Sequence, residues 1–208
     1  MSSPHGFRVM AYALAIAACS ATSAGAQPRR SELSLDFPFA GAARRDLGYV
    51  ATREALHPSF GASARVLGRV MRVDRLELHL GARLAATTWR TETLRQATRA
   101  FRTTFDPGFV VRGAHGPLSL ALTAGPTFAL PAIDELYSGV RTARGAHIEL
   151  ALGWGWVRGR SLLGVELAYM HHRLRTATPN ALTTTHIVAL RLTIGVAPRD
   201  SSGHLSAD

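Results

Sequence analysis

Cysteine and lysine are the residues that this sequence has least of. Its 208 residues include one cysteine, Cys19, and no lysine. A single cysteine excludes a disulfide within the chain and the cysteine clusters of structural zinc sites. Because lysine is absent, the formal net charge of +10 at pH 7 comes from arginine alone.

Long apolar runs are also missing after residue 26, so no membrane-spanning helix is predicted there. Residues 1–26 instead have the three parts of a cleavable signal peptide. Arg8 is the basic flank, residues 9–18 are the apolar run, and Ala-Gly-Ala at 24–26 is the small-residue cleavage site. The sequence therefore predicts export, with Gln27 as the first residue of the mature chain.

Cys19 gives this leader a second interpretation. Residues 16–19, Ile-Ala-Ala-Cys, resemble a lipoprotein signal in which the cysteine would be acylated. Signal-peptide cleavage after residue 26 is preferred, since a barrel anchors itself. The predicted organisation is a signal peptide over 1–26, one barrel domain over 27–198 and a polar tail over 199–208.

The basic composition does not indicate nucleic acid as a partner. The arginines are dispersed, and the sequence contains no recognisable nucleic-acid motif. It also contains no phosphate-binding loop, zinc pattern or nucleophile elbow, so neither a cofactor nor a metal is predicted. For an exported chain, anionic lipid headgroups are the better candidate partner.

Apolar residues recur at every second position in eight segments, which is typical of strands with one apolar and one polar face. The segment 75–89 is the clearest, with Leu76, Leu78, Leu80 and Leu84 on one face and Glu77, His79 and Arg83 on the other. The eight predicted strands cover residues 32–39, 60–70, 75–89, 105–112, 118–130, 146–157, 163–169 and 185–196.

The connections alternate between short and long. Short turns are predicted near 73–74, 113–116 and 158–160. Long polar loops are predicted elsewhere, including 40–59, 90–104 and 131–145, and a helical turn or two is expected within 90–104. An up-and-down topology places all the short turns at one end. Outer-membrane barrels keep short turns on the periplasmic side, so both termini are predicted to be periplasmic.

In this pattern the chain resembles the small eight-stranded outer-membrane barrels, which include the transmembrane domain of outer membrane protein A and the OmpX-like proteins. The resemblance covers nearly all of the mature chain and lies in pattern and topology. It implies an all-β, eight-stranded, antiparallel up-and-down transmembrane β-barrel, placed in a bacterial outer membrane by the barrel assembly machinery. One departure is that such barrels often end in an aromatic residue, whereas residues 197–208 form a polar tail.

Aromatic residues are expected at both ends of the apolar faces, as the two girdles of a spanning barrel require. The outer girdle would contain Phe37, Phe39, Phe60, Phe105, Phe128 and Tyr169, and the inner one Trp154 and Trp156. Alternation alone does not distinguish inside from outside. A soluble, lipocalin-like periplasmic binding barrel, with the apolar face inward, is therefore the alternative.

Charged residues share the opposite faces of most strands. They are Glu32, Asp36, Arg65, Arg69, Glu77, His79, Arg83, Arg112, His147, Glu149, Glu166 and Arg191. Charges in a narrow lumen must pair with one another. We expect Glu77, Arg83, Glu149, Glu166 and Arg191 to form such a paired network.

His147 beside Glu149 and Glu166 raises a second alternative, a lipid A-modifying barrel enzyme that uses His, Ser and a carboxylate. No His-x-Ser run accompanies His147, so no catalytic residue is predicted. His171 and His172 are adjacent in a strand and point to opposite faces, which does not favour one metal site holding both.

The outer loops are predicted to be basic. Eleven arginines lie at or beyond the outer strand ends, against five carboxylates there. We expect Arg95, Arg99 and Arg102 to contact lipopolysaccharide phosphates, because guanidinium groups pair with phosphate oxygens. A structural or surface-interaction role in the outer membrane is the function that these features favour.

Overall fold

The computed structural model describes most of the chain beyond the leader. The described residues are 29–46, 51–57, 59–92, 99–130, 142–158, 160–176 and 181–196. The predicted signal peptide, Cys19, Arg95 and the polar tail lie outside them. No helix in the described ranges has the length and hydropathy of a membrane span.

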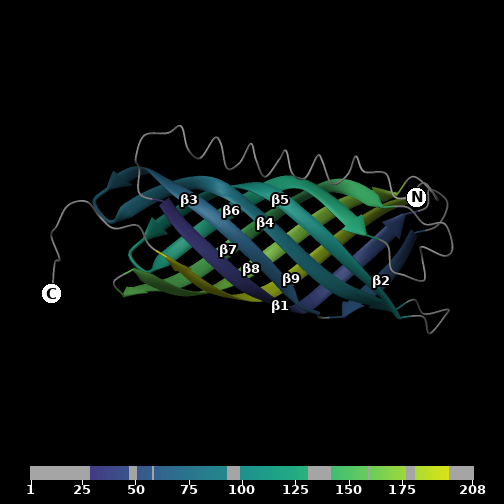
Figure 1. Cartoon of the computed structure of the whole chain (residues 1–208). Helices are drawn as coiled ribbons and strands as arrows, with labels where there is room; N and C mark the ends of the chain where they lie inside the picture. The colour runs from purple at the N-terminus through teal and green to yellow at the C-terminus, as the bar shows by residue number, and fades with distance from the viewer. Residues whose placement is uncertain are drawn as a thin grey trace, which may run out of the picture.

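The described chain is a single antiparallel sheet that closes on itself (Figure 1). Its strands are β1 (Arg29–Asp46), β2 (Ala51–His57), β3 (Gly61–Val73), β4 (Leu76–Glu92), β5 (Arg99–His115), β6 (Leu118–Leu130), β7 (Ala143–Arg158), β8 (Ser161–Thr176) and β9 (Ala181–Val196). Both β2 and β3 pair with β1 on one side and β4 on the other, so the two occupy one strand position. The result is an eight-stranded, all-antiparallel barrel, as the sequence predicts.

Pairing between the first and last strands closes the barrel. The register of β1 against β9 runs from Ser31 opposite Val196 to Asp46 opposite Leu182. Each described strand is thus paired on both sides, which is the condition for strands that cross a membrane.

Three tight turns lie at one end of the barrel, which we call the inner end; the opposite end is the outer end. Asp74, with φ of 52°, turns β3 into β4, and Gly116, with φ of 59°, turns β5 into β6. The third turn joins Arg158 to Ser161. The inner end also holds the start of β1 and the end of β9, as expected for an up-and-down barrel.

The apolar faces of the strands point outward. Leu80 is 45% exposed and Leu150 is 46% exposed, whereas Glu149 and Arg191, on the opposite faces, are 1% and 0% exposed. A soluble lipocalin-like barrel would have the reverse arrangement, so that alternative is wrong. An apolar exterior around a polar interior is typical of a membrane-spanning barrel.

Several strands extend further than the sequence predicts. Arg44 and Arg45 lie in β1 and Arg53 in β2, although we expected a loop over 40–59. The expected helical turn within 90–104 is also wrong in its described part, because Arg99 and Arg102 belong to β5. Pairing with neighbouring strands continues the ladder past the apolar segment, where the two-residue pattern has faded.

Two irregularities shift the register. One lies between Pro38 and Ala40 in β1 and the other between Arg69 and Met71 in β3. Pro38 lacks the N–H that a regular ladder position uses, so an irregularity is where a proline fits within a strand. Beyond each shift, inward-pointing positions change from even to odd residue numbers or from odd to even.

Candidate functional site

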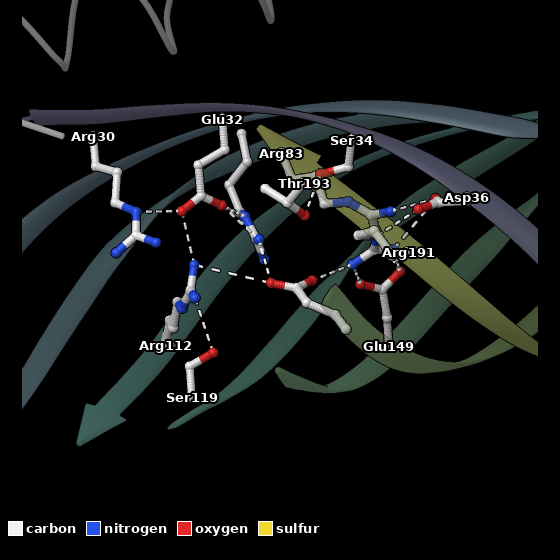
Figure 2. Close-up of polar contacts among 12 residues, drawn as sticks. Arg30, Glu32, Ser34, Asp36, Arg83, Arg112, Ser119, Glu149, Arg191 and Thr193 are labelled. Atoms are coloured by element: carbon white, nitrogen blue, oxygen red, sulfur yellow. Dashed lines mark hydrogen bonds and ion pairs between the residues drawn. The ribbon is translucent and has the colours of Figure 1, made fainter. Parts of the chain in front are cut away.

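Arg191 belongs to a charge network in the barrel lumen, where it lies beside Asp36 and Glu149 (Figure 2). It is on β9, and its guanidinium donates to Asp36 of β1 at 2.5 Å and to Glu149 of β7 at 2.8 Å. A further contact joins it to Glu166 of β8 at 3.0 Å. One arginine therefore links carboxylates from three other strands across the interior.

Three more buried arginines belong to the network. Arg83 of β4 contacts both Asp36, at 3.3 Å, and Glu149. Arg65 of β3 lies 2.6 Å from Glu166, and its Nε donates to Glu32 of β1 at 2.7 Å. The remaining contacts belong to Arg112 of β5, which donates to Glu32 and to Ser119, both at 2.8 Å.

The fully buried part of the network is balanced in charge. Its four arginines are Arg65, Arg83, Arg112 and Arg191, and its four carboxylates are Glu32, Asp36, Glu149 and Glu166. Arg30 of β1, whose side chain is 13% exposed, also contacts Glu32, at 2.5 Å. Burying a charge is costly unless it is paired and hydrogen-bonded. Equal numbers of both signs, arranged so that each group contacts at least two others, meet the pairing requirement. Two buried nitrogens, Nη1 of Arg65 and Nε of Arg112, have no hydrogen-bond partner.

Four of the five residues expected in the lumen network lie together: Arg83, Glu149, Glu166 and Arg191. Glu77 does not join them. It contacts Arg69 at 3.2 Å and His79 at 3.1 Å, close to the β3–β4 turn at the inner end. The strand alternation had placed Glu32, Asp36, Arg65 and Arg112 on inward faces, yet we did not assign them to the network.

A second polar cluster is centred on Asp106 of β5. Its carboxylate accepts hydrogen bonds from Thr127 at 2.6 Å and Thr104 at 3.2 Å, and lies 3.2 Å from Nε2 of His172. The His147 ring also contacts Thr127, at 3.1 Å. We missed Asp106 because the strand over 105–112 had the weakest pattern; counting back from Arg112 in steps of two would have placed Asp106 inward.

This cluster contains a hydroxyl, an imidazole and a carboxylate in a row. Thr185 Oγ1 lies 3.0 Å from Nδ1 of His172, whose other nitrogen faces Asp106. A similar order of groups supports acyl transfer in hydrolases. Here Thr185 is 2% exposed and His172 is 0% exposed, so the row is closed to a substrate in this structure. Pairing of buried polar groups accounts for the contacts.

His147 and Glu149, which raised the enzyme alternative, belong to different clusters. Glu149 is engaged by two arginines, and His147 by Thr127 and the Pro126 carbonyl. No observation on these residues favours lipid chemistry. The described residues also contain no group of three or more His, Cys, Asp or Glu side chains placed to hold a metal ion.

Arginines are exposed on the outward faces at the outer end, where they form what we call the rim. The described members are Arg44 of β1, Arg144 of β7, and Arg173 and Arg175 of β8. Arg144 is directly opposite Arg175, and Thr184 of β9 lies between Arg44 on one side and Arg173 on the other.

The three arginines expected to contact lipid are placed only in part. Arg95 lies outside the described residues. Arg99 and Arg102 lie in the outer part of β5, in register with Glu92 and Trp89 of β4.

No protein-family model and no curated protein matches this sequence. Several solved structures of outer-membrane barrels are similar to it over most of the chain. OprG from Pseudomonas aeruginosa gives a TM-score of 0.48 at 10% identity, over 83% of this chain and 96% of that chain. The protease OmpT from Escherichia coli gives 0.45 at 8% identity, over 82% and 96%.

The attachment invasion locus protein Ail of Yersinia pestis is a third such structure. It gives a TM-score of 0.44 at 10% identity, over 79% of this chain and 97% of that chain. Likeness at this level of identity assigns no residue of this chain a role.

Proposed function

We propose that this chain is an outer-membrane barrel protein with a structural or surface-interaction role, whose rim arginines contact lipopolysaccharide phosphates. The observation that carries the proposal is the outward exposure of Arg44, Arg144, Arg173 and Arg175 directly beyond the apolar surface. Insertion by the barrel assembly machinery is part of the same proposal.

Strand β8 shows how the outer surface changes with depth. Its outward residues from the inner end are Leu163, Val165, Leu167, Tyr169, His171, Arg173 and Arg175. Each outward step of two residues advances about 7 Å along the strand. The arginines therefore begin one such step beyond His171, at the level where lipid headgroups would border the apolar surface of a spanning barrel.

The grouping of the rim arginines supports an anionic partner. Arg144 and Arg175 are register partners, and Arg44 and Arg173 flank Thr184. A phosphate near several guanidinium groups would form charge-assisted, bidentate hydrogen bonds with them. Lipid A phosphates have this chemistry.

The test compares two variants that lose the same charge at opposite ends of the barrel. One carries R44Q, R144Q and R173Q at the outer end. Its matched control carries R75Q, R158Q and R160Q, which replace three exposed arginines at the inner end. Binding of added lipopolysaccharide to each folded barrel is measured in zwitterionic detergent over a range of salt concentrations.

We expect the outer-end variant to bind at least about tenfold more weakly than wild type at low salt, since each cation near an anionic surface contributes about 1 kcal/mol. The difference should shrink as salt rises. The inner-end control should bind like wild type. Equal losses in the two variants, or no loss in either, would contradict a specific outer rim.

The earlier expectation for Arg95, Arg99 and Arg102 is tested in a third variant, in which all three become Gln. Arg99 and Arg102 lie beyond Phe105 along β5, at the outer end of the barrel, where the rim also lies. Weaker salt-sensitive binding in this variant would extend the rim to β5. Unchanged binding would confine it to β1, β7 and β8.

A further inference from the structure

Two histidines face each other on the outer surface of the barrel. His171 of β8 and His186 of β9 are register partners. Their Nδ1 atoms lie 3.4 Å apart, and their ring centroids are 4.7 Å apart. Sequence alternation placed His171 opposite to His172, but the partnership with His186 depends on the register of two strands.

A third electron-pair donor approaches the same point. The Tyr169 hydroxyl lies 2.6 Å from Nδ1 of His186. One imidazole nitrogen has a single hydrogen-bonding direction, as either donor or acceptor. His186 Nδ1 can therefore form a hydrogen bond with Tyr169 or with His171, but not with both. The other of these two close contacts is left without a hydrogen bond.

A metal ion would use the electron pairs that converge there. Metal-to-imidazole nitrogen distances are about 2.0–2.1 Å. Two such nitrogens are therefore roughly 2.9 Å apart at adjacent positions of a square-planar ion and roughly 3.4 Å apart on a tetrahedral ion. The Nδ1 atoms of His171 and His186 are 3.4 Å apart, so a shift of about 0.5 Å or less lets both rings bind one ion.

We propose that His171 and His186 form an outward-facing binding site for a divalent transition-metal ion. Water or a lipid phosphate would complete the coordination, since among the described residues no group of three or more His, Cys, Asp or Glu side chains is placed to hold a metal ion. His186 is exposed and His171 half-buried, so an ion can reach the pair.

The ligand set determines which ions bind. Neutral imidazoles favour copper, nickel and zinc, whereas calcium and magnesium prefer oxygen ligands. Arg173 follows two residues beyond His171 on the same face and disfavours cations that bind by charge alone. Copper should bind most tightly of the three favoured ions, in accordance with the usual order of divalent metal affinities.

The experiment titrates Cu²⁺ into the full chain, prepared without a histidine tag and folded in detergent. Electron paramagnetic resonance then reports how many nitrogens coordinate the ion. The variants are H171A and H186A, and the matched control is H115A, which removes an exposed histidine at the inner end. Heat-modifiable gel migration confirms that each variant is folded before binding is measured.

We expect wild type and H115A to show two-nitrogen coordination of Cu²⁺. H171A and H186A should each bind Cu²⁺ at least about tenfold more weakly, because in wild type the second imidazole binds an ion that the first already holds. Millimolar Ca²⁺ or Mg²⁺ should not displace the copper. The proposal is overturned if H171A and H186A bind like wild type, or if H115A loses as much affinity as they do. Metal binding here does not depend on whether the rim arginines contact lipid.

Discussion

Arg191 contacts carboxylates from three strands, of which that of Asp36 on β1 is 155 residues away in the sequence. The two-residue alternation predicts that Arg191, Glu149 and Glu166 face the lumen. It does not predict which charges meet, because that depends on the register and on the shifts at Pro38 and Arg69. Glu77 illustrates the difference: it shares a strand face with Arg83, yet its depth places it beside Arg69 near the inner end.

Removing one carboxylate from the lumen network should be more harmful than its own contacts suggest. E149Q leaves Arg83 with Asp36 alone and adds an uncompensated positive charge to a buried, balanced cluster. We expect E149Q to lower the free energy of unfolding by about 3 kcal/mol. The measurement is reversible urea unfolding in detergent or lipid.

The double variant E149Q/R83Q restores the charge balance. Its cost should be smaller than the sum of the two single variants by about 1 kcal/mol or more, as a double-mutant cycle measures. E77Q is the control, because Glu77 and its partners Arg69 and Arg72 are partly exposed and such pairs contribute less than about 1 kcal/mol. Strict additivity between the E149Q and R83Q changes would show that these two charges act independently.

The strands were predicted well where one face is apolar and less well where both faces are polar. Within the apolar surface, residues such as Leu150 and Leu192 indicate both the strand and its outward face. Toward the outer end, Arg44, Arg53 and Arg102 belong to strands because neighbouring backbones pair with them. Such pairing is nonlocal, and a local pattern does not contain it.

Position along a strand should determine how a charge on the outward face is tolerated. Leu150 lies mid-strand on β7, whereas Leu76 starts β4 beside the inner turn; both are outward and about equally exposed. L150R should destabilise the folded barrel by about 2–4 kcal/mol and L76R by no more than about 1 kcal/mol, since the cost falls from the bilayer midplane to the interface.

The two variants are compared by urea unfolding of the barrel in lipid vesicles, and by the fraction that migrates as folded protein. In detergent micelles, which adapt to the protein surface, the difference should be smaller. If L150R and L76R were equally stable in vesicles, the mid-strand position of Leu150 would not lie within the hydrocarbon region.

At the scale of the whole molecule, two polar clusters fill much of the lumen. The charge network joins β1, β3, β4, β5, β7, β8 and β9, and the cluster around Asp106 joins β5, β6, β7, β8 and β9. An eight-stranded barrel has an interior just wide enough for side chains to fill. An interior filled in this way fits the proposed structural or interaction role better than diffusion through a pore.

We expect the apolar outer face of this barrel to contact lipid, and a nitroxide at Leu150 tests that claim. The probe is attached to L150C in a C19S background, and R144C, at the rim on the same strand, is the matched control. In lipid vesicles, oxygen should relax the nitroxide at 150 strongly and a water-soluble nickel complex should not. At 144 the order should reverse. Strong relaxation by the nickel complex at 150, with little by oxygen, would contradict the claim.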